Sequence, residues 1–306
     1  MPYQKFAIVA AGDLGCLIAK SLLLEGANVL VISRPASSSG KNLPATVRPE
    51  SSSGKSLPAS IKVITVDYSD VPALTSTFKE HEIEVVISTL PARAIAQFQT
   101  GLGDAAKQGG VKLFVPSDFG FLPTPGRDAN AMFTLKSQFA EHLKGIRLPF
   151  LRIFNGLFVT YVPWLLALES GKIQIIGKGD RNASFTHPTD VAGFLSHILT
   201  HLPTPELEDK EFRIEGEQGC LLDVARIYGP KYPVEHVQEY PEGLVGKSLG
   251  DYLQWLIEAG YGSVVPEGAD ASLSNHLWKG HVWKSIQEGL GLNILSQEEL
   301  ISKASA

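Results

Sequence analysis

The sequence lacks several features that mark particular classes of protein. It has only two cysteines among 306 residues, which excludes a disulfide framework, and Cys16 falls inside a helical pattern where we expect a buried free thiol. No apolar run approaches the roughly 20 residues that a membrane span needs, and the apolar N-terminus has no signal-peptide cleavage pattern. A net charge of −5 argues against nucleic acid as the main partner. We therefore expect a cytoplasmic protein.

The pattern of the first half favours an α/β fold. An apolar content of 44% over 306 residues is enough for one large domain, or for a core and a smaller lobe. Apolar strand patterns alternate with helical patterns, which predicts a Rossmann-type, doubly wound parallel sheet with ligands at the carboxyl ends of its strands. We place an NAD(P)-binding domain at residues 1–155 and a smaller substrate-binding lobe at 156–306, part of which packs back on the sheet.

The expected elements follow from these periodicities. Strands are expected at 6–10, 28–33, 61–66, 84–90, 111–116 and 149–154, and helices at 13–25, 71–80, 94–108 and 131–144. In the second half we expect helices near 157–170, 189–201 and 271–289. Ser296 and Glu299 have the spacing of a capping box, which predicts a final short helix.

A glycine turn near the N-terminus predicts a dinucleotide site. Residues 6–32 read FAIVAAGDLGCLIAKSLLLEGANVLVI, in which an apolar strand leads through a glycine turn into a helix and a second strand. Gly12 lets a pyrophosphate approach the backbone at the helix N-terminus, and Gly15 lets the helix lie close to the strand. Ala10 stands where such motifs usually have their first glycine. The alternative is a βαβ unit that is simply packed and binds nothing.

A tandem repeat interrupts the pattern after the second strand. Residues 34–47 (RPASSSGKNLPATV) are repeated with few changes at 48–61 (RPESSSGKSLPASI), and Pro, Ser and Gly dominate both copies. We interpret 34–61 as a loop with a local duplication. Dinucleotide enzymes read the adenosine ribose at this position, and an acidic residue there favours NAD. Arg34 and Lys41 are cations that can pair with a 2′-phosphate, so the sequence favours NADPH. The alternative is a solvated loop whose charges serve solubility.

Lys136 is the candidate for proton transfer. Residues 116–120 (PSDFG) end the fifth expected strand and face the cofactor cleft, and Lys136 follows on the next helix. Burial and the helix dipole would lower the pKa of such a lysine enough for proton exchange at neutral pH; the alternative is an ordinary surface lysine. No tyrosine has a lysine four residues later, and Met132 stands four residues before Lys136. A Tyr-x-x-x-Lys mechanism is therefore not expected.

These motifs together resemble one family. The chain resembles the isoflavone reductase-like, NmrA-like branch of the atypical short-chain dehydrogenases/reductases over residues 5–200. The segments that carry the resemblance are Gly12-x-x-Gly15, Arg34, VISTL at 86–90, PSDFG at 116–120, Phe133-x-x-Lys136, RIFNGLF at 152–158 and DVA at 190–192. The resemblance implies NADPH as the cofactor, hydride transfer to a phenolic or polyketide-like aromatic substrate, and Lys136 as general acid/base.

The motifs also imply which residues line the site. The expected cofactor-binding residues are Gly12, Asp13, Leu14, Gly15, Arg34, Lys41, Thr89, Leu90, Pro91, Ser117, Lys136 and Asn155. An aromatic substrate pocket would contain Phe119, Phe158, Tyr161 and Trp164, which are equally plausible as core residues. His187 is expected to cap or brace the helix that begins near Thr189. The group His276, Trp278, His281 and Trp283 suits packing better than a metal site, so no metal is expected.

Three functions remain open on these grounds. The leading prediction is an NADPH-dependent reductase of an aromatic secondary metabolite. A non-catalytic regulator that senses NADP is one alternative, and a non-redox dehydratase or cyclase on the same fold is another. As partners we expect a small aromatic molecule, with a homodimer left open, and neither nucleic acid nor a membrane.

Overall fold

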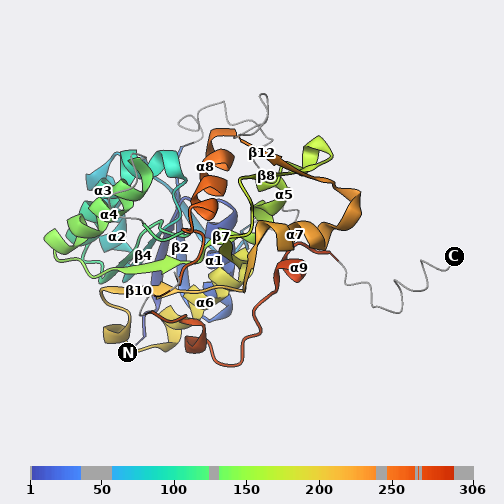
Figure 1. Cartoon of the computed structure of the whole chain (residues 1–306). Coiled ribbons are helices and arrows are strands. Elements are labelled where there is room, and N and C mark those ends of the chain that lie inside the picture. Colours follow the sequence, from blue (N-terminus) through green and yellow to red (C-terminus); the bar gives the residue numbers. More distant parts are fainter. Residues whose placement is uncertain are drawn as a thin grey trace.

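The fold is built on a parallel sheet. The computed structural model describes residues 2–35, 57–123, 131–238, 247–265, 268 and 271–292 (Figure 1). Five parallel strands have the order β3-β2-β1-β4-β5. A parallel bridge between Phe114 and Phe150 links β5 to the next strand, β6, which pairs in parallel with β10. The strands are β1 (Lys5–Val9), β2 (Asn28–Ser33), β3 (Lys62–Thr65), β4 (Val85–Ser88), β5 (Leu113–Val115), β6 (Leu151–Phe154) and β10 (Lys210–Arg213).

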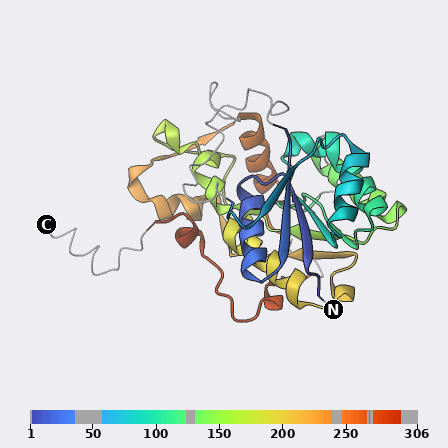
Figure 2. The ribbon, with the colours of Figure 1, turned by 180° about the vertical axis from the view of Figure 1, so that it is seen from behind.

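Helices cover both faces of this sheet. Along β1, Ala7 and Val9 pack against α2 (Val71–Glu80), α3 (Ala92–Gly109) and α4 (Ala131–Gly145), while Phe6 and Ile8 pack against α1 (Asp13–Leu24) and α6 (Pro188–His201). Figure 2 shows α1 and the helices α2 and α3 on opposite sides of the strands. Because both faces are buried there, the inner strands β1 and β4 and the strand β5 are apolar without alternation, whereas the edge strand β3 is mostly exposed. The predicted Rossmann-type doubly wound sheet is confirmed.

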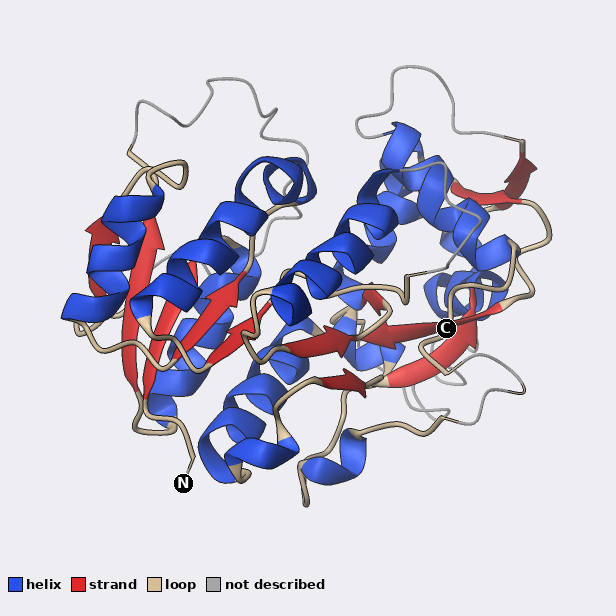
Figure 3. Ribbon diagram, turned by 90° about the vertical axis from the view of Figure 1, so that its left-hand side faces the viewer, coloured by secondary structure: helices blue, strands red, loops and turns tan. Residues whose placement is uncertain are grey.

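The second half adds short strands and helices beside the sheet, as Figure 3 shows. They enclose a third apolar core that includes Leu165, Ile175 and Phe185. Two segments of this half return to the first: α6 packs on α1, and β10 pairs with β6. The strands are β7 (Leu157–Phe158), β8 (Ile173–Ile176), β9 (Asn182–Thr186), β11 (Glu217–Cys220) and β12 (Val234–Val237), and the helices are α5 (Val162–Leu165), α7 (Leu221–Tyr228), α8 (Lys247–Glu258) and α9 (Ile286–Gly289). Single 3₁₀ turns occupy Val159–Tyr161, Leu168–Ser170, Thr204–Glu206, Gly229–Lys231 and Asn275–Leu277.

Two expected helices of the second half are wrong. Residues 157–170 are not one helix, because Leu157 and Phe158 pair with β9 as a strand and Ala167 takes a left-handed φ of 55°. Residues 271–289 form only a 3₁₀ turn and the short α9, since Gly280 interrupts them at a φ of 81°. Ser285 and Glu288 cap α9 reciprocally. The predicted helix at Ser296 lies outside the described residues.

Among the described helices, none has both the length and the apolar character that a membrane span needs.

Candidate active site

The glycine turn lies between β1 and α1. Gly12 is the N-cap of α1 and provides no side-chain cap. A Cβ atom built on Gly12 meets nothing within 4 Å, whereas one on Gly15 would lie 2.6 Å from Thr89 Oγ1 and 3.0 Å from the Ala10 carbonyl oxygen. Gly12 therefore leaves open space at the helix N-terminus, where N–H groups attract an anion. Gly15 is needed for the close approach of α1 to the strands, and Asp13 and Leu14 begin the helix.

Ala10 lies in the glycine turn, at a position whose backbone conformation suits glycine better than alanine. Its φ is 67°, in the left-handed region that disfavours residues with a Cβ atom. The turn is held by Thr89, whose hydroxyl donates to the carbonyl of Ala10 at 2.5 Å and lies 3.2 Å from that of Val9. Gly12 N–H also donates to the Ala10 carbonyl at 2.7 Å. Thr89, expected as a cofactor residue, thus braces the turn.

Arg34 follows β2, at the same edge of the sheet. Its guanidinium carbon lies 5.8 Å from the centre of the Tyr68 ring and 5.9 Å from that of Phe98. Tyr68 is itself fixed by a 2.9 Å hydrogen bond from its hydroxyl to the Ile32 carbonyl. The arginine is only partly buried, so its charge remains available at the strand end. Lys41, its expected companion, lies outside the described residues.

Ser117 and Leu90 join the ends of β4 and β5. The Ser117 hydroxyl donates to the Leu90 carbonyl at 2.8 Å, and Pro91 is the N-cap of α3. Gln99, on α3, accepts hydrogen bonds at Oε1 from the Ser88 hydroxyl and the Ser117 N–H, both at 3.1 Å. Its buried Nε2 has no partner among the described residues. Gln99 was missed in the sequence, where the signal was a polar residue on the apolar stripe of an amphipathic helix.

Lys136 is buried on α4. Its relative exposure is 7%, and no hydrogen bond to its ammonium group is found within the described part of the chain. Burial lowers the pKa of Lys136; the charge of Asp118 acts against this shift and that of Arg152 adds to it. The surface-lysine alternative is therefore wrong. A buried amine with a lowered pKa releases its proton more readily than a solvated lysine.

A buried ion pair stands beside Lys136. Arg152, from β6, donates from Nε to Asp118 Oδ2 at 2.5 Å and from Nη1 to Glu211 Oε1 at 2.6 Å. Its guanidinium carbon also lies 4.8 Å from the centre of the Phe154 ring. Asp118 Oδ1 and Arg152 Nη2 are buried without a partner among the described residues. Both residues fall in motifs quoted above, but the sequence gave no reason to pair them.

Asn155 follows β6 and is fully buried. Its Nδ2 donates to the Gly156 carbonyl at 3.2 Å, while its Oδ1 has no partner in the described residues. Its backbone N–H donates to the Gly120 carbonyl at 3.1 Å, which ties β6 to the loop after β5. Asn155 therefore presents an unused acceptor next to the segment that carries Asp118.

Three expected substrate residues lie together. Phe158, Tyr161 and Trp164 form an edge-to-face series, with ring centres 5.7 Å and 6.4 Å apart. Tyr161 is 37% exposed, and burial together with the charge of Asp13 raises the pKa of its hydroxyl. Tyr161 thus lies within electrostatic reach of Asp13, the first residue of α1. Phe119 and Phe158 both pack against the core between the sheet, α1 and α6.

His187, Trp278 and His281 pack as expected, whereas His276 is exposed. His187 is the N-cap of α6 and accepts a hydrogen bond from Thr189 N–H at 3.2 Å, which confirms its capping role. Trp278 stacks on His281 with ring centres 3.6 Å apart. A Cβ atom on Gly193 of α6 would lie 2.3 Å from the Trp278 ring, so the tryptophan packs directly on this helix.

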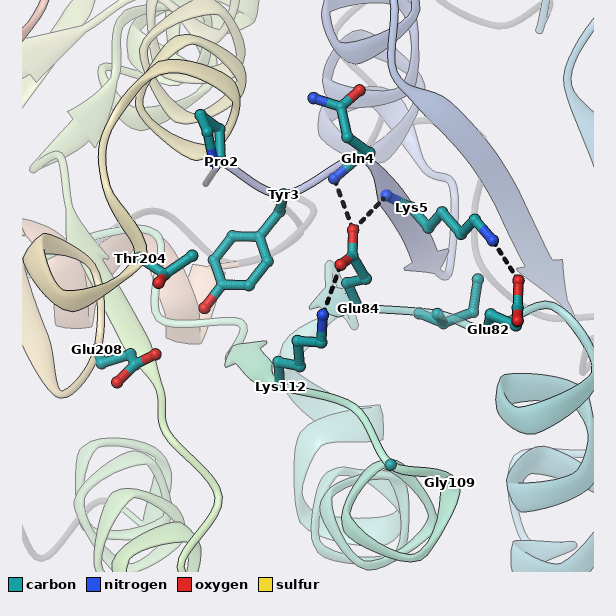
Figure 4. Close-up of a pocket in the computed structure, with 12 residues that line it drawn as sticks. Pro2, Tyr3, Gln4, Lys5, Glu82, Glu84, Gly109, Lys112, Thr204 and Glu208 are labelled. Carbon is teal, nitrogen blue, oxygen red and sulfur yellow. Dashed lines mark hydrogen bonds and ion pairs between the residues drawn. The ribbon is translucent and has the colours of Figure 1, made fainter.

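A large hollow lies at the opposite edge of the sheet. It has a volume of about 940 Å³ and contains Tyr3, Lys5, Glu84 and Lys112, which precede or begin the strands (Figure 4). Glu84 accepts hydrogen bonds from Gln4 N–H at 2.8 Å and from Lys112 at 2.7 Å. Its two lysines, Lys5 and Lys112, pair with Glu82 and Glu84. The glycine turn and Lys136 do not line this hollow. We therefore place the functional site at the carboxyl edge.

Comparison with known proteins shows the family of this chain. The NmrA-like family matches residues 5–226. The chain belongs to this family. It is 30% identical to Oxidoreductase BOA1 of Botryotinia fuckeliana (strain B05.10) over 192 residues, or 56% of this chain and 63% of that protein. It is 29% identical to Isoflavone reductase homolog P3 of Arabidopsis thaliana over 140 residues, or 42% of this chain and 44% of that protein. The chain matches less than two thirds of the length of these curated relatives.

Solved structures share the fold over nearly the whole chain. The binary complex of leucoanthocyanidin reductase with NADPH from Vitis vinifera has a TM-score of 0.72 at 19% identity, covering 94% of this chain and 98% of that chain. The structure of AtPrR2 with NADP+ and (+)pinoresinol has a TM-score of 0.71 at 18% identity, covering 95% and 98%. The predicted family resemblance is confirmed.

Proposed function

We propose that this NmrA-like protein is an NADPH-dependent reductase of an aromatic, phenolic or polyketide-like metabolite, with Lys136 as the general acid/base. The observation that carries the proposal is the burial of Lys136 beside the Asp118–Arg152 pair, at the sheet edge where the glycine turn leaves open space. Keeping a buried lysine charged costs free energy. Packing alone therefore does not explain a lysine at position 136.

The residues at the carboxyl edge fit a dinucleotide phosphate. The open space at Gly12 and the uncapped start of α1 suit a pyrophosphate, and Arg34 suits the 2′-phosphate that distinguishes NADPH from NADH. The unpartnered Gln99 Nε2 and Asn155 Oδ1 are a buried donor and acceptor that an amide-bearing ring could satisfy. The cofactor would supply the hydride. The complexes of the neighbours with NADPH and NADP+ support this assignment.

The aromatic series supports the substrate class. Phe158, Tyr161 and Trp164 present ring edges and faces near the start of α1, and such surfaces bind flat aromatic molecules through offset or edge-on contacts. The names of the solved neighbours point in the same direction, since leucoanthocyanidin reductase and the complex with (+)pinoresinol concern phenolic molecules.

Lys136 would handle the proton at its Nζ atom. When a substrate oxygen gains negative charge, a protonated Lys136 can donate to it, and the neutral amine that remains is tolerated because burial already lowers its pKa. Asp118 opposes the loss of that proton, and Arg152 favours it. The two charges thus set how readily Lys136 exchanges its proton.

The proposal is tested with the purified protein, NADPH and a panel of phenolic, quinone and enone substrates. We expect NADPH oxidation that matches product formation mole for mole with at least one aromatic member, and slower turnover with NADH. NADPH binding without turnover over a broad panel would favour the NADP-sensing regulator. Product formation without NADPH consumption would favour the dehydratase or cyclase.

A further inference from the structure

Three potential metal ligands converge on the outer surface between α1 and α6. Glu25 is the C-cap of α1, and His197 and His201 stand four residues apart on α6. One ligand atom from each residue lies within 4.8 Å of those of the other two. Two histidines at this helical spacing lie on one face of the helix. The sequence did not reveal the cluster, because Glu25 is far from the histidines along the chain.

The carboxylate and the imidazoles face each other without hydrogen bonding. His197 Nδ1 lies 4.0 Å from Glu25 Oε1, and His201 Nε2 lies 3.9 Å from Glu25 Oε2. These separations are too long for hydrogen bonds. A tetrahedral zinc ion with bonds of about 2.0–2.1 Å holds its ligand atoms roughly 3.3 Å apart. The ligand atoms, which lie within 4.8 Å of one another, must therefore close by up to about 1.5 Å around an ion. The stacked rings of His197 and His201, now at an angle of 24°, must also turn so that both lone pairs point to the ion.

The ring nitrogen of His201 that points away from Glu25, Nδ1, has a neighbour like that of a metal-binding histidine. Its Nδ1 lies 3.0 Å from the His197 carbonyl oxygen, which can only accept. The Thr200 hydroxyl also lies 3.0 Å from Nδ1, but it donates to the Ser196 carbonyl at 2.8 Å. Both neighbours of Nδ1 can therefore accept its hydrogen, and this tautomer leaves the lone pair on Nε2, the atom that faces Glu25. Metal-binding histidines commonly donate their second N–H to a carbonyl or carboxylate in this way.

The cluster is held by packed elements. His197 stacks on Trp278 and on His201, with ring centres 5.9 Å and 4.2 Å away. α1 and α6 share one buried core (Figures 1 and 2), in which Ile18 and Leu22 pack with Leu195 and Ile198. Glu25 and His201 are exposed and His197 is partly buried, so an ion can enter from solvent and keep a water as its fourth ligand.

We propose that Glu25, His197 and His201 bind a divalent transition-metal ion, with zinc as the best match for two imidazoles and one carboxylate. The twelve residues of α1 span about 18 Å, so the ion lies at the end of the helix remote from the glycine turn. Its role is structural: it ties the end of α1 to α6. The inference does not depend on the proposed reductase activity.

The test uses untagged full-length protein freed of metal with a chelator and titrated with ZnCl₂ by calorimetry. We expect one zinc ion per chain and a rise of Tm with zinc concentration, as linkage requires. His201→Ala and Glu25→Gln should each weaken zinc affinity at least tenfold. Both residues are exposed, so circular dichroism of the metal-free variants should match wild type.

His276→Ala is the matched control, because His276 is exposed and lies outside the cluster; this variant should bind zinc like wild type. Co²⁺ should give a visible spectrum of four-coordinate geometry that His201→Ala abolishes. Absence of zinc binding would overturn the proposal, as would equal affinity in wild type, His201→Ala and Glu25→Gln.

Discussion

Ala10 is strained in a turn that would suit glycine. Its left-handed φ of 67° costs an alanine about 1–2 kcal/mol, while glycine loses about 0.5–1 kcal/mol of extra backbone entropy on folding. Ala10→Gly should therefore raise the free energy of unfolding by about 0.5–1 kcal/mol. Urea denaturation of both proteins measures the difference. A clear loss of stability would show that the alanine methyl makes contacts that outweigh the strain.

Substitution of Gly12 and of Gly15 should have different effects on stability and on NADPH binding. Gly12→Ala places a methyl in open space, so the free energy of unfolding should change by less than about 0.5 kcal/mol. NADPH affinity should fall at least tenfold, because the methyl occupies the approach of the pyrophosphate.

In Gly15→Ala, the new methyl would lie 2.6 Å from Thr89 Oγ1. This substitution should lower the free energy of unfolding by about 1–3 kcal/mol. Thermal unfolding and NADPH titration separate the two effects; tight NADPH binding by Gly12→Ala would place the cofactor elsewhere.

Among the elements, the end of β2 is where we propose that Arg34 favours NADPH over NADH. Arg34→Ala should weaken NADPH binding by roughly 1–3 kcal/mol, the range of a charge-assisted hydrogen bond, and leave NADH binding nearly unchanged. Arg226→Ala is the control, since Arg226 is an exposed arginine on α7, paired with Asp223. Fluorescence titration with both cofactors measures the effect. Equal losses for NADPH and NADH would contradict the role of Arg34.

The repeated loop offers a test of an element by deletion. Removing 48–61 joins Val47 to Lys62, so that Val47 takes the place of Ile61, which is buried in the core beside α1 and α6. An Ile-to-Val change in a core costs about 0.5–1.5 kcal/mol, and shortening a loop changes the closure entropy little. We expect Tm and NADPH affinity close to wild type. A large loss of either would show that the second copy has a function of its own.

The sequence predicted some elements much better than others. The helix expected at 71–80 is α2 (Val71–Glu80), because Asp70 caps it and one clear apolar stripe defines it. The expected helix at 157–170 failed because pairing of Leu157 and Phe158 with β9 overrode local helical periodicity. The α7 and α8 helices and the strands β8, β9, β11 and β12 were not predicted. Short strands that pair across long stretches of sequence leave little local signal.

The site could be predicted only in part for a similar reason. Lys136, the glycine turn and the aromatic residues were visible as motifs or as neighbours along the chain. The pairing of Asp118 with Arg152 and the support of Ser117 by Gln99 depend on distances between β5, β6 and α3. Such contacts arise from tertiary packing, which a single sequence does not encode as spacing.

For the whole molecule, the burial of Lys136 should oppose stability. Its pKa is lowered in the folded state, whereas an unfolded lysine keeps a pKa of about 10.4. Between these two pKa values the unfolded chain binds more protons, so the contribution of Lys136 to the free energy of unfolding rises with pH. Lys136→Met removes the penalty and keeps an apolar stem. Its Tm at neutral pH should equal or exceed that of wild type, and the difference should shrink as the pH rises. A variant clearly less stable than wild type at neutral pH would mean that the Asp118 contact outweighs burial.

In the proposed reaction Lys136 moves the proton while NADPH supplies the hydride. The most direct test measures NADPH affinity and turnover of wild type and Lys136→Met with one substrate found in the panel. Turnover should fall by about 10²–10⁴-fold, the range of general acid–base catalysis, and NADPH affinity should fall much less. Turnover by Lys136→Met at the wild-type rate would contradict the account.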